Sequence, residues 1–470
     1  MNKFFFTFFL GAIASWSMAP TNWWFVLFFS LSGLFTALQT SDTAKKAFAA
    51  GFGFSFGYFT FSLYWIGNAL LVENNPYWWA WPLAVTGLPF ILSFFTATAA
   101  LLFYSFKTKN PYQFLNCFTF IILITLSEYA RGHLFTGFPW NLYGYSWINI
   151  KPIAQVAALH DIYLLTALTI LWATTPAFCI SGKTSKPTKW FMLLFSLGTF
   201  SLSYAYGWDK IQKYQITNSD TKIILVQPNI KQSEKWDSTK RLDHFEETLK
   251  LSRNPEPSDT KTHIVLWPET ALAPDIMYAP QTKSMIQEML ATYSNDAYLI
   301  TGALRNENDT YYNSILIFDK NANIIYTYDK SHLVPFGEYI PLSHIFDITP
   351  IVGFTGFAKG HGPETFYLNA NISLSALVCY EIIFPSKTYD RTANQPSMII
   401  NVTNDAWYGD SPGPYQHLVQ TQFRAIETGI PIFRSANTGI SASINPLGQI
   451  LESIPYGQNG VITKELPKTQ

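Results

Sequence analysis

Long apolar segments separated by short polar turns fill the first 207 residues. The apolar runs lie at about Phe4–Met18, Trp23–Leu38, Ala47–Leu71, Trp78–Phe106, Phe114–Tyr129, Ile153–Ile180 and Trp190–Tyr206. A helix needs roughly 20 apolar residues to cross the hydrocarbon core of a bilayer. Several runs are shorter, so their helices must extend into the neighbouring turns, and the sixth is long enough to tilt or to include an interfacial turn. The pattern predicts about seven membrane-spanning helices.

The pattern changes after residue 221. Short β-branched runs then alternate with turn residues and amphipathic segments, which is typical of an α/β domain. Strands are predicted at Lys222–Gln227, His263–Trp267, Tyr298–Thr301, Tyr312–Phe318, Ile372–Val378 and Ser397–Val402, and helices at Ser238–Leu251 and Pro414–Thr428. We therefore predict a membrane domain at 1–207, a linker at 208–221, an α/β domain at 222–465 and a tail at 466–470.

The composition separates the same two parts. Charged residues make up 13% of the chain, against about 25% in an average soluble domain. The formal net charge is zero, but residues 1–207 contain ten of the 31 basic residues and only four of the 31 acidic ones. A positive first part is thus joined to a negative second part. Neither part has the dense basic patches of a nucleic-acid-binding protein, so the expected partner is a lipid bilayer and not nucleic acid.

Lysines in the short loops predict the orientation. One set of alternate loops contains Lys3, Lys45, Lys46, Lys107, Lys109, Lys183, Lys186 and Lys189, and the other set contains only Arg131 and Lys151. Because short cytoplasmic loops are enriched in basic residues, the N-terminus is expected in the cytoplasm. Seven crossings then place the chain after Trp208 outside, which is the periplasm in a bacterium with two membranes. The first run also imitates a signal peptide, but an uncleaved helical hairpin is the simpler interpretation because apolar residues resume at Trp23.

Two further features of the first half allow a functional and a structural interpretation. Gly53-Phe54-Ser55-Phe56-Gly57 matches the G-x-S-x-G pattern of serine hydrolases, which requires a strand, a sharp turn and a helix. Inside an apolar span, its small residues more simply allow close helix packing. The outer loop Glu128–Trp147 is rich in aromatic residues, which predicts either an interfacial aromatic belt or a surface that holds a lipid or lipoprotein.

Three segments of the second half place reactive side chains after or between predicted strands. They are Trp267-Pro268-Glu269-Thr270, the segment from Lys330 to Glu338, and Val378-Cys379-Tyr380-Glu381. Only about 3% of an ordinary thiol is ionised at pH 7, so a nucleophilic cysteine benefits from a neighbouring base. Glu269 can be that base, and Lys330 can stabilise an oxyanion. Taken singly, each residue is more often a surface glutamate, a solvated lysine or a core cysteine.

Cys379 is the only cysteine of the polar half; the other two, Cys117 and Cys179, lie within apolar runs. This distribution implies no disulfide framework. A lone thiol in an oxidising compartment suggests a reactive role, although a buried inert cysteine remains the alternative. The eight histidines show neither H-E-x-x-H spacing nor a Cys/His cluster, and there is no phosphate-binding loop or dinucleotide motif. We expect no metal and no cofactor.

Together with their flanking residues, the three segments resemble those of the nitrilase superfamily, and in detail those of the apolipoprotein N-acyltransferase family. The similarity covers nearly the whole chain. It includes Gln227-Pro228, Lys235-Trp236, Gly137–Trp140, Asn404–Gly409 and Arg434–Gly439. The resemblance implies a multi-pass α-helical membrane domain followed by a nitrilase-like αββα sandwich.

The resemblance also implies a role for each residue of the site. Cys379 becomes the nucleophile, Glu269 the general base and Lys330 the residue that stabilises the oxyanion. Glu338 matches a second active-site carboxylate, with the physical role of orienting Lys330. The supporting residues implied in this way are Tyr380, whose N–H joins the oxyanion hole, Glu381, and Trp236, which lines the lipid entrance.

The implied reaction moves an acyl chain from a membrane phospholipid, through a Cys379 thioester, to the α-amine of a diacylated apolipoprotein. We expect a monomer in the bacterial inner membrane with a periplasmic catalytic domain. A membrane-anchored amide hydrolase and a non-enzymatic lipoprotein-binding scaffold are the alternatives. The chain departs from the family after Ile462, where no further apolar run follows. We therefore expect the catalytic domain to be anchored from one side only.

Overall fold

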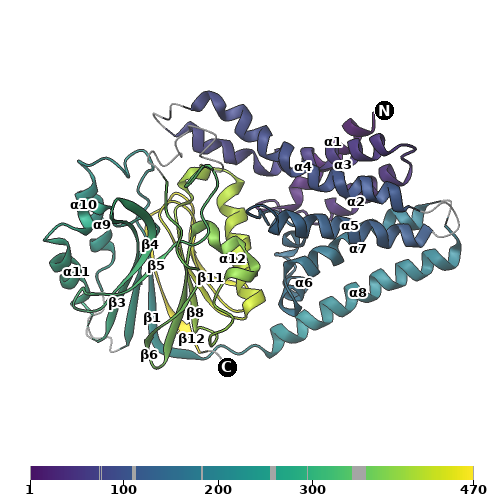
Figure 1. The fold of residues 1–470 in the computed structure, drawn as a ribbon. Coiled ribbons are helices and arrows are strands. Elements are labelled where there is room, and N and C mark those ends of the chain that lie inside the picture. The colour runs from purple at the N-terminus through teal and green to yellow at the C-terminus, as the bar shows by residue number, and fades with distance from the viewer. Residues whose placement is uncertain are drawn as a thin grey trace. The chain divides into compact units, whose positions relative to one another are not determined.

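The computed structural model describes residues 2–72, 75, 77–107, 113–181, 184–254, 261–293, 295–340 and 356–468. Lys109 and Lys183 of the predicted charge pattern, and the last two residues of the predicted tail, lie outside these residues. The chain divides into two compact units, and each is described by itself (Figure 1). The first unit comprises 1–214 and 408–427, and the second comprises 215–407 and 428–470.

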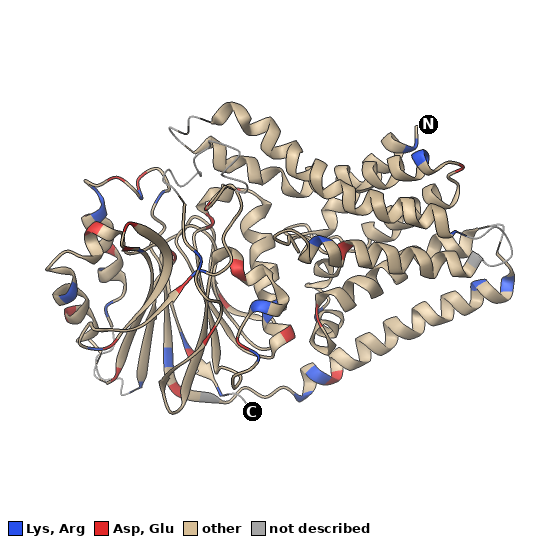
Figure 2. Cartoon of the chain, in the orientation of Figure 1, with Lys and Arg blue, Asp and Glu red and all other residues tan. Residues whose placement is uncertain are grey.

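The first unit is helical, as predicted. Its helices are α1 (Lys3–Ala14), α2 (Val26–Gln39), α3 (Ala44–Leu63), α4 (Trp81–Phe106), α5 (Gln113–His133), α6 (Lys151–Ala154), α7 (Ile162–Ile180), α8 (Lys186–Lys213) and α12 (Pro412–Thr428). Within the described residues, three segments are long and apolar enough to cross a membrane: Trp78–Phe106, Phe114–His133 and Ile162–Ile180. The apolar helices Lys3–Ser17 and Val26–Gln39 are shorter. Figure 2 shows that these helices carry few charged side chains along their length.

The sixth predicted run is not one continuous helix. Its first residues form α6 and a 3-10 helix at Gln155–Leu159, and the long helix α7 begins only at Ile162. The break occurs because Asp161 caps α7: its carboxylate accepts a hydrogen bond from the backbone N–H of Tyr163 at 2.8 Å. The sequence allowed either one tilted helix or an additional turn for this run, and the structure has the additional turn, formed by α6 and the 3-10 helix.

The glycines of the G-x-S-x-G match serve close helix packing, which confirms the structural interpretation. They lie within α3, where a Cβ at Gly57 would stand 2.1 Å from the carbonyl oxygen of Phe8 in α1. A Cβ at Gly53 would stand 2.6 Å from the carbonyl oxygen of Phe4. Because only glycine lacks a Cβ, α1 and α3 approach at a distance that another residue would prevent.

Much of the outer loop Glu128–Trp147 is buried within the first unit. Trp140 and Trp147 are at most 1% exposed, whereas Phe135 and Tyr129 are exposed. Arg131 forms a buried ion pair with Glu128 at 2.6 Å and donates to the carbonyl oxygens of Phe138 and Trp140. The buried guanidinium of Arg131 therefore holds the loop against the end of α5. The residues of an interfacial belt would instead be exposed on the surface.

Helix α12 packs within the first unit, although its residues lie inside the predicted α/β domain. Gln416 explains this placement. Its Oε1 accepts hydrogen bonds from the indole N–H groups of Trp65 and Trp140 and from the Asn141 amide. Its Nε2 donates to the carbonyl oxygen of Ser62. A buried amide with all of these partners is costly to remove, so α12 is held by polar as well as apolar contacts.

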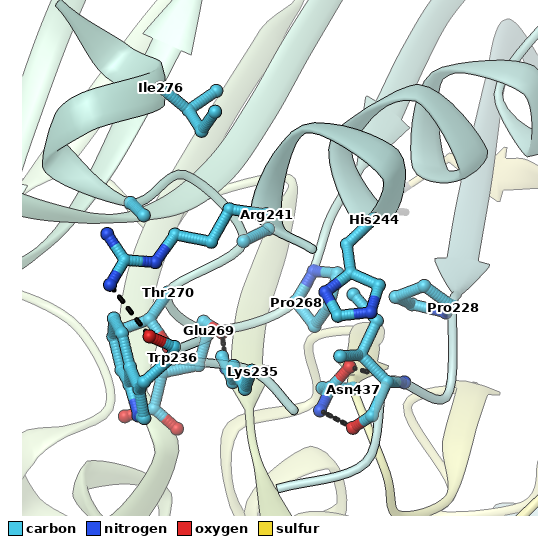
Figure 3. A pocket seen from close by; sticks show the side chains of 13 residues that line it. Pro228, Lys235, Trp236, Arg241, His244, Pro268, Glu269, Thr270, Ile276 and Asn437 are labelled. Atoms are coloured by element: carbon cyan, nitrogen blue, oxygen red, sulfur yellow. Dashed lines mark hydrogen bonds between the residues drawn. The ribbon is translucent and has the colours of Figure 1, made fainter. Parts of the chain in front are cut away.

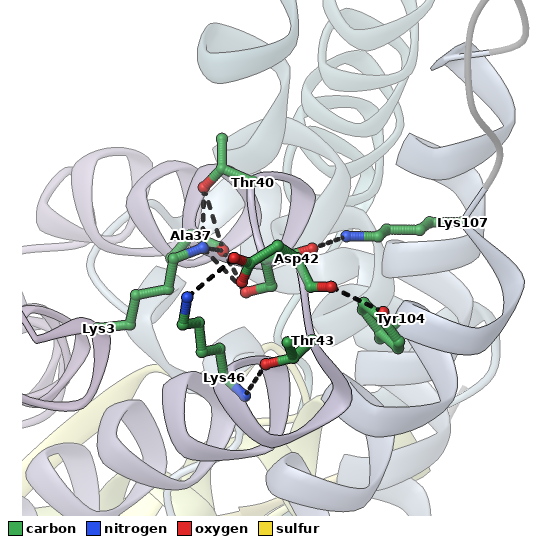
Figure 4. A network of polar contacts seen from close by, with 9 residues as sticks. Lys3, Ala37, Thr40, Asp42, Thr43, Lys46, Tyr104 and Lys107 are labelled. Carbon is green, nitrogen blue, oxygen red and sulfur yellow. Dashed lines mark hydrogen bonds and ion pairs between the residues drawn. The ribbon is translucent and has the colours of Figure 1, made fainter.

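Three of the predicted loop lysines meet at the turn between α2 and α3 (Figure 4). Lys3 donates to the carbonyl oxygen of Ala37 at 2.8 Å, Lys107 donates to the carbonyl oxygen of Ser41, and Lys46 pairs with Asp42 at 2.9 Å. Cations near the C-terminus of α2 bind its unpaired carbonyl groups and interact favourably with the negative end of the helix dipole. This end of the unit therefore concentrates positive charge.

The second unit is an α/β sandwich of two six-stranded sheets. The first sheet has the order β12 (Gly460–Pro467), β1 (Asn218–Gln227), β2 (Thr262–Leu266), β3 (Ala297–Glu307), β4 (Thr310–Phe318) and β5 (Ile324–Asp329). The second has the order β11 (Ile450–Ile454), β10 (Ser441–Ile444), β9 (Ile432–Ala436), β8 (Met398–Thr403), β7 (Ile372–Val378) and β6 (Thr365–Asn369). All six predicted strands are present.

One core lies between the sheets and another lies outside the first sheet. The inner core contains Ile223 and Ile264 from the first sheet with Leu374 and Ile400 from the second, all fully buried. The outer core packs α9 (Arg241–Leu251) and α11 (Thr282–Leu290) on the other face of the first sheet, and α10 (Pro274–Met277) lies between them in sequence. Burial on both faces explains why apolar residues predominate in the central parallel strands. Together with the helical unit, this sandwich confirms the predicted fold class.

Candidate active site

Cys379 stands at the point where a buried strand turns sharply. Strand β7 ends at Val378, and Cys379 begins a 3-10 helix over Cys379–Ile383. Its φ is +50°, a left-handed conformation that side chains other than glycine rarely adopt and that costs on the order of 1 kcal/mol or more. The residue is 8% exposed. Such strain at a reactive residue directs the thiol away from the path of the strand.

Glu269 follows β2 and reaches the same region. Beyond Leu266 the backbone stays bound to β3, because the Trp267 N–H donates to the Ile300 carbonyl and the Pro268 carbonyl accepts from the Gly302 N–H. Pro268 itself has no N–H to donate. The backbone of Glu269 lies directly on β3: a Cβ at Gly302 would stand 2.5 Å from the Cα of Glu269. Glycine at position 302 therefore permits this close approach. Glu269 is 7% exposed.

Lys330 follows β5 and forms a buried ion pair. It is 1% exposed, and its Nζ donates to the Oε1 of Glu338 at 2.8 Å. The second carboxylate oxygen of Glu338 accepts from the backbone N–H of Val334 at 2.8 Å. Glu338 thus pairs with Lys330 by a charge-assisted hydrogen bond within one short loop, which is the contact that the expected orienting role requires.

Asn313 joins the two carboxylates and was missed by the sequence analysis. It lies on β4, 2% exposed, and its Nδ2 donates to Glu269 at 2.8 Å and to Glu338 at 3.1 Å. The backbone carbonyl of Asn313 also accepts from the backbone N–H of Lys330 at 2.9 Å. The available signal was an amide side chain within an otherwise apolar and aromatic strand, where a buried polar group needs partners.

Burial and the neighbouring charges determine the protonation states of the site. Burial raises the pKa of Glu269 above its usual range, while the cation of Lys330 opposes that rise. Burial alone would lower the pKa of Lys330, but the carboxylates of Glu338 and Glu269 together hold it above its ordinary value. Burial raises the pKa of Cys379, and the negative charge of Glu269 adds to that effect. Lys330 is therefore held in its charged form, whereas burial favours the protonated forms of Glu269 and Cys379.

Glu381 connects the turn of Cys379 to the segment of Lys330. Its Oε2 accepts from the backbone N–H of Val378 at 2.8 Å. Its Oε1 accepts from the Tyr328 hydroxyl at 2.9 Å and from the Ser331 hydroxyl at 2.7 Å. One buried carboxylate thereby ties the end of β7 to the end of β5.

The remaining predicted residues lie at the periphery. Tyr380 is 6% exposed and packs with His332 and Phe384, whose ring centroids are 4.0 Å apart. Trp236 is 40% exposed, and it lines a small pocket with Glu269 and Lys235 (Figure 3). The structure thus gathers the predicted triad in one buried place, with Trp236 at a more open edge.

Comparison with known proteins gives one consistent result. The family profile "Carbon-nitrogen hydrolase" matches residues 222–469, and the profile "Apolipoprotein N-acyltransferase N-terminal domain" matches residues 10–175. Proteins named apolipoprotein N-acyltransferase are similar over nearly the full length. The chain is 34% identical to that of Rhodopseudomonas palustris (97% of this chain, 88% of the relative) and 34% identical to that of Rickettsia prowazekii (98% and 91%).

Solved structures also resemble part of the chain. A CN-hydrolase superfamily protein from Xanthomonas campestris is 21% identical, with a TM-score of 0.40, over 52% of this chain and 89% of its own. An amidase from a Nesterenkonia species is 19% identical, with a TM-score of 0.40, over 54% of this chain and 92% of its own.

Proposed function

The chain belongs to the apolipoprotein N-acyltransferase family, and we propose that it works by a two-step transfer through a thioester on Cys379. It is a membrane acyltransferase of lipoprotein maturation, with a lipid donor and a lipoprotein acceptor. The proposal adds the chemistry: the donor is a membrane phospholipid, and the acceptor group is the α-amine of an N-terminal diacylglyceryl-cysteine. The observation that carries it is the strained, buried Cys379 within the electrostatic reach of Glu269 and Lys330.

In the first step the enzyme is acylated. Glu269 takes the thiol proton as the sulfur attacks the ester carbonyl carbon, and the carbonyl oxygen becomes an oxyanion. The ammonium of Lys330 and the backbone N–H of Tyr380 stabilise that negative charge. The tetrahedral intermediate collapses to the thioester, and the leaving lysophospholipid oxygen takes the proton from Glu269.

In the second step the acyl chain moves to nitrogen. The neutral α-amine attacks the thioester carbonyl, and Glu269 accepts a proton from the attacking nitrogen. Collapse of the second tetrahedral intermediate forms the amide and expels the sulfur, which recovers its proton from Glu269. Because the enzyme is acylated before the acceptor reacts, the kinetics are expected to be ping-pong.

Trapping the acyl-enzyme tests the proposal directly. Purified protein given phospholipid without acceptor is expected to gain the mass of one acyl chain on the peptide containing Cys379, labile to neutral hydroxylamine as thioesters are. Adding a diacylated lipopeptide with a free α-amine should discharge the chain onto nitrogen. The matched control is the same lipopeptide with its α-amine acetylated, which lacks a nucleophilic lone pair and should leave the acyl-enzyme intact.

Two results would contradict the proposal. Transfer that proceeds without any acyl-enzyme in the wild type would exclude the thioester route. Discharge mainly to free fatty acid, despite abundant lipopeptide, would indicate the hydrolase alternative.

We also propose that the protein lies in the bacterial inner membrane with its N-terminus in the cytoplasm and its catalytic domain in the periplasm. The lysines gathered near the α2–α3 turn support this orientation (Figure 4). In a background where all native cysteines are alanine, Ser185→Cys is expected to react with an impermeant maleimide only after permeabilisation. Gln458→Cys should react in intact spheroplasts, and the opposite labelling pattern would reverse the orientation.

The proposal also covers the domain bounds, the oligomeric state and the role of Trp236. We take residues 1–207 as the membrane domain and 222–465 as the catalytic domain, working as a monomer. Trp236, partly exposed at the pocket edge, is suited to contact an entering acyl chain because an indole ring offers a large apolar face.

A further inference from the structure

A second lysine is buried beside the proposed base. Lys235 lies in the segment after β1, is 7% exposed, and donates from Nζ to the main-chain carbonyl oxygen of Glu269 at 2.9 Å. Figure 3 shows the side chain on the wall of the pocket, next to Glu269 and Trp236. Buried lysines are uncommon unless a negative charge compensates them. The position therefore calls for an electrostatic explanation.

Lys235 faces groups of the proposed active site and two further basic side chains. Burial lowers its pKa to about 8, and the charges of Glu269 and Cys379 act in the opposite direction. On the pocket wall stand Arg241 and His244; the guanidinium of Arg241 pairs with Asp275 at 2.8 Å. Among the described residues, the anionic groups acting on Lys235 are thus those of the proposed active site. Below about pH 8 its ammonium remains charged.

A count of buried charges shows what Lys235 contributes. The site contains two carboxylates joined by the neutral amide of Asn313, and Lys330 pairs directly with only one of them, Glu338. Two other nearby carboxylates have their own partners: Glu381 is bound by N–H and O–H donors, and Asp405 by Arg434 at 2.6 Å. With Lys330 alone, the pair Glu269 and Glu338 would carry a net negative charge in a buried place, which favours protonation of one of them. Lys235 restores the balance.

We infer that Lys235 is a positioning residue for acyl transfer, whose ammonium supplies the second buried cation and keeps Glu269 ionised and able to accept a proton. Its hydrogen bond to the Glu269 carbonyl also holds the backbone of the base. This inference rests on the proposed function, because it concerns the same acylation step. It adds a residue to which no part of the triad chemistry assigns a role.

The sign of the expected effect follows from the charge. A general base must be deprotonated, so the acylation rate rises with pH as Glu269 ionises. Removing a neighbouring cation favours the protonated carboxyl and the protonated thiol, so that limb of the profile moves to higher pH. At neutral pH the rate is expected to fall by about tenfold or more, and raising the pH should recover it.

Three substitutions separate charge from hydrogen bonding. Lys235→Met removes both, Lys235→Gln keeps an N–H donor without the charge, and Lys235→Arg keeps both. The single-turnover acylation rate from phospholipid is measured across pH for each variant and for the wild type. Lys240→Met, at an exposed lysine of the same segment, is the matched control for loss of a positive charge.

The expected result is a shifted pH profile in the Met and Gln variants, with wild-type behaviour in the Arg variant and in the control. A loss of equal size at every pH, or recovery of the profile by Gln, would overturn the inference in favour of a purely structural role. If Lys235→Met does not fold, the pH profiles of Lys235→Gln and Lys235→Arg still show whether the charge or the hydrogen bond matters. Failure of the wild type itself to become acylated would instead refute the proposed function.

Discussion

Replacing Cys379 by alanine is expected to abolish both acylation and transfer, with a fall in rate on the order of 10⁴-fold or more, as when the nucleophile of a catalytic triad is removed. The physical reason is that alanine has no thiol with which to form the acyl intermediate. Alanine keeps the Cβ, so the left-handed turn at φ +50° gains no new steric conflict. Unchanged thermal unfolding of the variant would show that the loss is chemical.

The two other cysteines provide the control. Cys117 is buried and Cys179 is partly buried in the helical unit, and alanine at either position should leave the acylation rate near that of the wild type. The measurement is acyl-chain incorporation from a radiolabelled phospholipid, followed by transfer to a diacylated lipopeptide. Near-normal transfer by Cys379→Ala would exclude the thioester mechanism, whatever the effect of the other two substitutions.

Replacing Lys330 by methionine is expected to lower the acylation rate by about 100-fold or more, which is the usual cost of a lost oxyanion donor. Methionine has a similar length but no charge, so the developing oxyanion loses the cation proposed to stabilise it. The substitution also leaves Glu338 buried without the ammonium that it binds at 2.8 Å, and an uncompensated buried charge destabilises the fold. Pre-steady-state acylation and thermal unfolding are therefore measured together.

Two further variants separate catalysis from stability. Lys330→Met combined with Glu338→Gln removes the unpaired carboxylate, so it should recover stability but not the acylation rate. Lys320→Met, at an exposed lysine that binds the carbonyl oxygen of Asn295, should change neither. A double variant that regains normal acylation would show that Lys330 acts only by holding the fold together.

The second unit shows how far local patterns lead. Strands such as β7 and β8 were predicted because they are short runs rich in apolar and β-branched residues, and parallel strands buried on both faces favour that composition. Strands β5, β6, β9, β10, β11 and β12 were not predicted. The edge strands β11 and β12 show the reason. Both strands mix exposed polar residues with apolar ones. They form at the sheet edges because they pair with strands distant in sequence, and a local sequence window does not contain those partners.

The first unit gives a complementary case. Its apolar runs predicted helices because lipid and protein interiors both favour apolar side chains. The same reasoning assigned α12 to the α/β domain and left the loop Glu128–Trp147 as either an aromatic belt or a surface that holds a lipid or lipoprotein. In the structure, the hydrogen bonds of Gln416 place α12 in the first unit, and the ion pair between Glu128 and Arg131 is buried there. A local pattern shows neither burial nor contacts between residues as far apart in the chain as Gln416 and Trp140.

By itself, the sequence determined the two-part architecture and the residue types of the candidate triad, because hydropathy and short motifs are local properties. Only the tertiary structure revealed that Asn313 bridges Glu269 and Glu338, and that Lys235 is a second buried cation beside the base. Asn313 carried no signal that the sequence analysis used, and Lys235 stood out only as part of a family segment with no role of its own. Their importance comes from the removal of water around several charges at once, since in a buried site each carboxylate needs a donor or a cation that only the folded chain can bring to it.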